Sequence, residues 1–106
     1  MTDQRHSYST AVEGGAQVRQ RYTITGRMNV SDYLAFVAER ATWFGVGGWV
    51  KAQDETSVTL LAAGPEAMVG ALEMACTLGP MTALVEHVDR VDEAGPTPVG
   101  FEIRQK

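Results

Sequence analysis

Apolar and polar side chains alternate one by one along residues 17–26, with Tyr22 and Ile24 in one set of positions and arginines and threonines in the other. An alternation of period two in β-forming residues is typical of a strand that buries one face. From Tyr33 onward the period changes, because apolar residues recur every three or four positions, as on one face of a helix. The pattern therefore predicts a strand over 17–26 and a helix over about 31–43.

The same two periods continue to the end of the chain, with glycine or proline at most of the joints. They predict, in order, a strand over 48–52, a polar turn over 53–56, a strand over 57–62, a helix that begins after Gly64 and ends before Gly79, a strand over 83–91 and a short strand over 99–104. The apolar positions of the strand over 83–91 slip in phase, which indicates a β-bulge.

This order is strand, helix, strand, strand, helix, strand, with an extra strand at the C-terminal end. Both helices can cover one face of an antiparallel sheet, so the predicted fold is the two-layer, ferredoxin-like βαββαβ sandwich of the α+β class. Residues 1–16 are mostly polar and show no sustained period, so we expect a flexible N-terminal tail there. Residues 17–106 then form one domain, since a chain of 106 residues has no room for a second core.

Charge and cysteine content narrow the classes of function. The formal net charge is -4 at pH 7, which argues against a nucleic acid or an anionic membrane surface as the partner. No apolar run approaches the ~20 residues that cross a bilayer, and the first residues lack the apolar core of a secretory signal. The single cysteine excludes an internal disulfide. We therefore expect a cytoplasmic location.

Histidine, cysteine and tryptophan residues do not form a pattern that suggests a metal or redox site. The two histidines lie far apart in the sequence, and a zinc site needs three or four converging ligands. Cys76 falls on the apolar stripe of the second predicted helix, where a small buried residue is the simplest interpretation. Trp43 and Trp49 are interpreted as anchors of the helix–sheet core, with a ligand pocket as the alternative. We expect no metal and no cofactor.

Several turn and core segments, in their order and spacing, resemble the acylphosphatase family: Gly48-Trp49-Val50, Gly64-Pro65-Glu66, Gly79-Pro80 and residues 100–104. The resemblance implies hydrolysis of the carboxyl-phosphate bond of acyl phosphates. In that family a loop of pattern G-x-V-Q-G-V-x-F-R follows the first strand, and its backbone N–H groups and final arginine hold the phosphate. An asparagine in the pattern G-W-V-x-N positions the attacking water.

Carried over residue by residue, the loop pattern falls on residues 26–34, and both chemical positions depart from it. Leu34 stands where the family has its arginine, and Ala52 stands where it has its asparagine. Val30 replaces a glycine, although a β-branched residue resists the positive φ that glycine permits. We therefore expect no catalytic residue. The prediction is an acylphosphatase-like domain without normal acylphosphatase activity, acting as an accessory module that binds a small anionic ligand or a protein partner.

The alternative is a diverged acylphosphatase that hydrolyses acyl phosphates weakly or acts on an altered substrate. Its anion-binding loop would consist of Arg27, Met28, Asn29, Val30, Ser31 and Asp32. Arg27 would then supply the charge that the family's arginine position lacks. Simpler interpretations are an exposed surface residue for Arg27, a helix cap for Asn29 or Ser31, and a first-turn acidic residue for Asp32.

Overall fold

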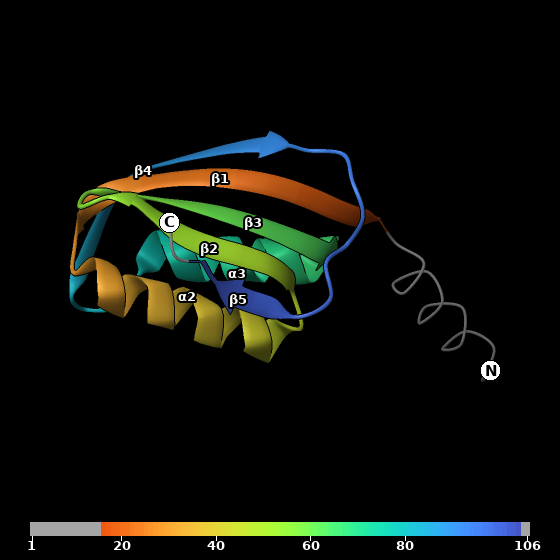
Figure 1. The fold of residues 1–106 in the computed structure, drawn as a ribbon, viewed down its shortest axis with the longest axis horizontal. Helices are drawn as coiled ribbons and strands as arrows, with labels where there is room; N and C mark the ends of the chain where they lie inside the picture. The colour runs from red at the N-terminus through yellow and green to blue at the C-terminus, as the bar shows by residue number, and fades with distance from the viewer. Residues whose placement is uncertain (1–15, 105–106) are drawn as a thin grey trace, which may run out of the picture.

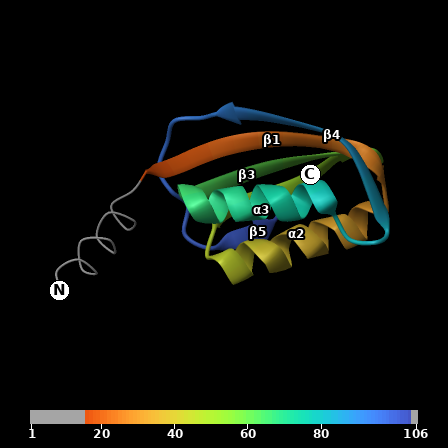
Figure 2. The ribbon, with the colours of Figure 1, turned by 180° about the vertical axis from the view of Figure 1, so that it is seen from behind.

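The computed structural model of the chain describes residues 16–104, so the predicted tail lies outside the described residues except for Ala16. Five strands and two helices follow one another in the predicted order. Both helices lie on the same side of the sheet (Figure 1), and the view from behind shows α3 beside α2 on that side (Figure 2). The two-layer α+β sandwich is therefore confirmed. The elements are β1 (Gln17–Met28), α2 (Val30–Phe44), β2 (Gly47–Asp54), β3 (Ser57–Pro65), α3 (Glu66–Leu78), β4 (Ala83–Asp92) and β5 (Phe101–Ile103).

The sheet has the strand order β4-β1-β3-β2-β5 and is mixed rather than purely antiparallel. Four strands pair antiparallel, as expected, but β5 pairs parallel to β2. The reason is that the connection over 93–100 reverses the chain, so β5 runs opposite to β4. Because β4 itself runs opposite to β2, the last strand must lie along β2 in the same direction. The expectation of a wholly antiparallel sheet was wrong for this strand.

The ends of α2 and the irregularity in β4 follow local sequence chemistry. Asn29 caps α2, since its side-chain Oδ1 accepts a hydrogen bond of 3.0 Å from the backbone N–H of Asp32. Gly45 ends the helix in the left-handed conformation, with φ 68°. The predicted bulge is confirmed, because the pairing of β1 with β4 shifts register and leaves Glu86 as the extra residue. No helix in the range 16–104 is long and apolar enough to cross a membrane.

The core lies between the two helices and the sheet. Apolar side chains from one face of β1, β2 and β3 meet the buried stripes of α2 and α3, and burying them is the main favourable term in folding. Two tyrosines belong to this core, and Tyr33 donates a hydrogen bond of 2.6 Å from its hydroxyl to the backbone oxygen of Cys76. The largest fully buried side chains of this core are Tyr22, Tyr33, Ile24, Leu60, Leu72, Val37, Val50, Val58, Val69 and Cys76.

The two tryptophans do not anchor the core between the helices and the sheet, which corrects the expectation. Trp43 is 64% exposed on the surface of α2, where the guanidinium of Arg40 lies 4.1 Å from its ring. Trp49 is only 8% exposed, but it shares a sheet face with Leu61, on the side away from the helices. Val50, the next residue of β2, is the one that faces the core. Alternation along a strand fixes opposite directions for Trp49 and Val50.

Candidate functional site

The segment over 26–34, where the resemblance places a phosphate loop, does not form a loop. Its first three residues continue β1, and their pairing with β4 extends to Met28 opposite Ala83. A single residue, Asn29, connects the strand to α2, which begins at Val30. Gly26 is required by the close approach of β4, since a Cβ at this position would lie 2.2 Å from the backbone oxygen of Leu84. The segment therefore consists of the paired end of β1, the Asn29 cap and the first residues of α2.

Several backbone N–H groups of this segment already have acceptors within the protein. The N–H of Gly26 donates to the oxygen of Thr56 at 3.0 Å, and the N–H of Tyr33 donates to the oxygen of Asn29 at 2.9 Å. The N–H of Asp32 is held by the Asn29 side chain, as described above. Within residues 16–104, no residue other than glycine has a positive φ, so Val30 does not adopt the turn that a glycine would permit. These three N–H groups are therefore already engaged within the protein.

Leu34 and Ala52 occupy the two positions where the family pattern has an arginine and an asparagine. Leu34 is half-buried in α2 and packs against the core. Ala52 is half-buried in β2 and pairs with Val58 of β3. Neither side chain carries a donor or acceptor, so neither can bind a phosphate oxygen or orient a water molecule.

A shallow hollow of about 630 Å³ opens beside the start of α2 and is lined by Val30, Ala52, Asp54, Glu55 and Thr56. The carboxylate of Asp54 accepts hydrogen bonds from the backbone N–H and the hydroxyl of Thr56, at 2.8 and 3.1 Å. The bond from the backbone N–H is the main cause that lowers the pKa of this carboxyl. Asp54 is therefore ionised at neutral pH. The hollow combines an apolar wall with negative charge, which disfavours a phosphate.

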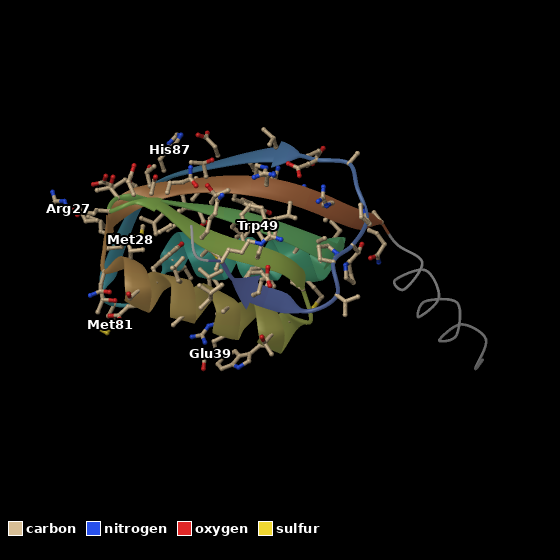
Figure 3. All side chains as sticks on the ribbon, viewed as in Figure 1. Arg27, Met28, Glu39, Trp49, Met81 and His87 are labelled. Carbon is tan, nitrogen blue, oxygen red and sulfur yellow. The ribbon has the colours of Figure 1, made fainter. Side chains whose placement is uncertain are left out.

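Arg27 does not reach this hollow. It lies between Gly26 and Met28 on β1, and alternation along the strand directs its side chain to the face opposite the helices. Figure 3 shows Arg27 at the end of the sheet, with its side chain directed away from the molecule and from α2. The structure therefore does not bring Arg27 together with Leu34 and Ala52.

The remaining residues of the predicted loop lie apart from one another. Met28 is half-buried and packs against the core, whereas Ser31 and Asp32 are exposed in the first turn of α2. Asn29 acts as the cap, which is the simpler of its two interpretations. Binding of an anion by these residues stays a prediction.

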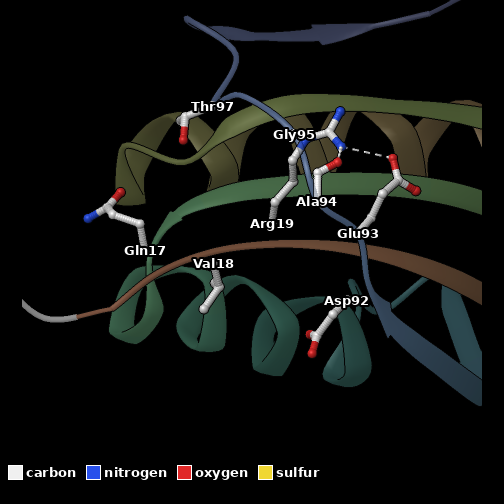
Figure 4. A pocket seen from close by; sticks show the side chains of 8 residues that line it. All are labelled: Gln17, Val18, Arg19, Asp92, Glu93, Ala94, Gly95 and Thr97. Atoms are coloured by element: carbon white, nitrogen blue, oxygen red, sulfur yellow. Dashed lines mark hydrogen bonds and ion pairs between the residues drawn. The ribbon is translucent and has the colours of Figure 1, made fainter.

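The sequence did not reveal a cluster of charges on the face of the sheet away from the helices. Arg19 and Arg21 both bind Glu93, with N–O distances of 3.0 and 2.6 Å. Figure 4 shows Arg19 directed toward Glu93 and the backbone oxygen of Ala94, to which it also donates at 2.8 Å. The hydrogen bond from Arg21 is the main cause that lowers the pKa of Glu93. More than 70 positions separate these partners in sequence, so no local pattern could have indicated the pairing.

Trp49 lies at the centre of the same face, beneath three cationic side chains. The guanidinium groups of Arg21 and Arg104 lie 5.3 and 4.7 Å from its ring centre, and the ammonium of Lys51 lies 5.6 Å away. These distances are within the range of favourable cation–π contacts. Arg21 and Arg104 thus both cover the ring and pair with a glutamate.

In the described part of the chain, cysteine and histidine offer no catalytic arrangement. Cys76 is 1% exposed, and burial raises the pKa of its thiol to about 12, so it is inert as a nucleophile in the folded protein. His87 is exposed on β4, 3.1 Å from the carboxylate of Asp89. Among residues 16–104, no group of three or more histidine, cysteine, aspartate or glutamate side chains is placed to hold a metal ion.

Comparison with known proteins gives one consistent result. The sequence model of the acylphosphatase family matches residues 20–103. The chain is 38% identical over 96 residues to an acylphosphatase of Salinibacter ruber, an alignment that covers 89% of this chain and 100% of that protein. It is 32% identical over 89 residues to an acylphosphatase of Nitratidesulfovibrio vulgaris, covering 81% of this chain and 89% of that protein.

Solved structures agree with the sequence relatives. The acylphosphatase of Bacillus subtilis matches with a TM-score of 0.77 at 25% identity, covering 82% of this chain and 98% of that chain. The acylphosphatase of Coxiella burnetii has the same fold, with a TM-score of 0.77 at 23% identity over 83% of this chain and 93% of that chain. On the match over residues 20–103 and the identity to the Salinibacter and Nitratidesulfovibrio proteins, the chain belongs to the acylphosphatase family.

Proposed function

We propose that this member of the acylphosphatase family lacks normal acylphosphatase activity and acts as an accessory module that binds a small ligand or a protein partner. The observation that supports the proposal most is the pair Leu34 and Ala52, two apolar side chains at the positions where the family pattern has an arginine and an asparagine. An apolar side chain supplies neither a permanent charge nor an amide.

The size of the expected loss decides between an inactive domain and a merely weaker enzyme. Removing one preorganised donor that stabilises developing charge costs about 2.7–4 kcal/mol, or about 10²–10³ in rate. Two groups acting on one phosphate cost more than one, although their effects do not simply add. The expected rate therefore falls well below that of an acylphosphatase with both residues.

The charges around the hollow support the same conclusion. The ionised carboxylate of Asp54 lines it together with Glu55, and no arginine or lysine lies among its lining residues. Placing a phosphate there would bring like charges together without a compensating cation. An apolar or cationic group on a ligand suits this hollow better than the small anion expected from the sequence.

Hydrolysis of benzoyl phosphate tests the proposal directly. The wild-type chain, its Leu34→Arg/Ala52→Asn variant and the Bacillus subtilis acylphosphatase are assayed side by side. We expect a wild-type rate at least about 10²-fold below that of the Bacillus enzyme, and a gain of activity in the double variant. A Leu34→Met/Ala52→Ser variant is the matched control, because it changes both positions without adding a guanidinium or an amide. A wild-type rate close to that of the Bacillus enzyme would contradict the proposal.

Phosphate titration followed by amide NMR shifts separates the proposal from the alternative of a diverged enzyme. If the segment over 26–34 retains an anion site, its amide signals shift in a saturable way, and Arg27→Ala abolishes the shift. We expect no saturable shift, because β1 pairing and the Asn29 cap hold this segment. A saturable shift confined to 26–34 would favour the enzyme.

A further inference from the structure

The strand β4 forms one edge of the sheet, and its outer side is open. It pairs only with β1 among the described strands, and it spans ten residues, Ala83–Asp92, whereas β5 at the opposite edge spans three. Figure 1 shows β4 along the upper margin of the sheet, with no described segment beyond it. An edge strand presents unpaired N–H and C=O groups, which are a template for a further strand.

The side chains of β4 on the face away from the helices form a symmetrical series. The register with β1 places Leu84 beside Arg27, His87 beside Thr25, Asp89 beside Thr23 and Val91 beside Arg21, all on that face. Leu84 and Val91, at the two ends of the series, are each 57% exposed. His87 and Asp89 lie between them, and their side chains are 3.1 Å apart. The series therefore reads apolar, basic, acidic, apolar.

Such a series is complementary to itself when two strands run antiparallel. If a two-fold axis passes through Val88, His87 of one copy lies opposite Asp89 of the other. Past the bulge at Glu86 the register moves by one residue, as it does against β1, where His87 lies opposite Thr25 but Val85 lies opposite Gly26. Leu84 then lies opposite Val91 of the second copy. Leu84 of one copy thus meets Val91 of the other as an apolar pair, and the imidazole of His87 meets the carboxylate of Asp89.

We propose that the edge of β4 is a dimerisation surface for a second copy of this chain, which joins the two sheets into one continuous sheet. The two-fold arrangement uses the β4 edge of both copies, so the assembly closes as a dimer rather than growing into a fibre. The proposal does not depend on the absence of hydrolytic activity, and its failure would leave the proposed function unchanged.

Sedimentation equilibrium from low to high micromolar concentration is the first test. We expect a reversible monomer–dimer equilibrium for the full chain. Leu84→Lys is expected to raise the dissociation constant at least about tenfold, since symmetry places each substitution twice in the interface, and Leu84→Lys/Val91→Glu is expected to recover most of the loss. Met74→Lys on α3 is the matched control, because Met74 is also exposed, at 66%, but lies on the helix layer. A chain that stays monomeric at high micromolar concentration overturns the proposal.

Disulfide formation tests the register itself. Leu84→Cys and Val91→Cys are prepared as single variants, and the buried Cys76 does not interfere. A mixture of the two variants is expected to form a disulfide between positions 84 and 91 under mild oxidation, while each variant alone forms far less, because a disulfide needs Cα atoms within about 7 Å. Equal cross-linking in the single-variant samples, or a mixture that does not cross-link, overturns the proposed register. Far-ultraviolet circular dichroism verifies that each variant is folded.

Discussion

The hollow beside α2 and the face of the sheet away from the helices differ in charge, and the difference is the reverse of what a phosphate site needs. The hollow is lined by Asp54 and Glu55 and by apolar side chains. The opposite face carries Arg21, Lys51 and Arg104 around Trp49. Among the described residues, this cluster of cations thus lies on the face of the sheet away from the helices, whereas no arginine or lysine lines the hollow.

The comparison shows that a cationic side chain can bind an anionic ligand only when it points into the site and is not already paired with a carboxylate of the protein. On the outer face, Arg19 and Arg21 bind Glu93, and Arg104 binds Glu102 at 2.8 Å. These contacts hold a layer of long side chains over the sheet, where their methylene groups cover apolar surface. This layer of side chains covers Trp49 and Leu61. The residues that line the hollow include no comparable layer.

Trp49→Ala should break this outer layer and give the largest effect. Trp49 is 8% exposed and is contacted by three cations, so its loss removes both buried apolar area and their common partner. We expect the free energy of unfolding to fall by about 3–5 kcal/mol, measured by urea denaturation. Trp43→Ala is the matched control, because Trp43 is 64% exposed, and it should cost less than about 1 kcal/mol. Equal losses would show that the layer does not stabilise the fold.

Asn29→Ala should destabilise the start of α2, beside the hollow, and lower the free energy of unfolding by a smaller amount. The substitution leaves the N–H of Asp32 without its side-chain acceptor, and removal of such a cap costs about 1 kcal/mol. Urea denaturation should show this loss, and Asn29→Ser should restore most of it, since serine also caps helices. If Asn29→Ala leaves the free energy of unfolding unchanged, the hydrogen bond from Asp32 to Asn29 does not stabilise the first turn of α2. The segment over 26–34 would then be less restrained than its hydrogen bonds indicate.

Glu93→Gln should have the smallest effect, and the effect should depend on pH. Arg21 holds the pKa of Glu93 below its ordinary value of about 4.3. A carboxyl with a lowered pKa stabilises the fold above its unfolded-state pKa, and this contribution is lost as the pH falls through the folded-state pKa. The urea midpoint of the wild type should therefore exceed that of the variant at pH 7, with the difference shrinking below about pH 4. A difference that persists at low pH would assign it to packing instead of charge.

Local sequence chemistry predicted much of the fold. The alternation around Tyr22 and Ile24 identified β1, and the slip in phase between Val85 and Val88 identified the bulge. A helix cap at Asn29 or Ser31 was expected, and Asn29 provides it. Each of these features depends on residues within a few positions of one another, so a pattern along the chain is enough to find it.

Features that depend on distant partners could not be predicted in the same way. The period of β2 shows that Trp49 and Val50 face opposite sides, but it does not say which side the helices cover. Nothing near Arg19 in the sequence points to Glu93, and nothing in the last strand fixes its direction relative to β2. At the candidate site, the departures at Leu34 and Ala52 could be read directly from the sequence, whereas the direction of Arg27 required the structure.

The burial of Cys76 has a consequence for handling and measuring this protein. It is the only cysteine in the chain, it is 1% exposed, and its thiol has a pKa of about 12. Alkylating reagents act on the thiolate, so they cannot modify the native chain until α3 separates from the sheet. The rate at which one label is incorporated in native buffer therefore reports how often the interior of the domain opens, without any engineered probe.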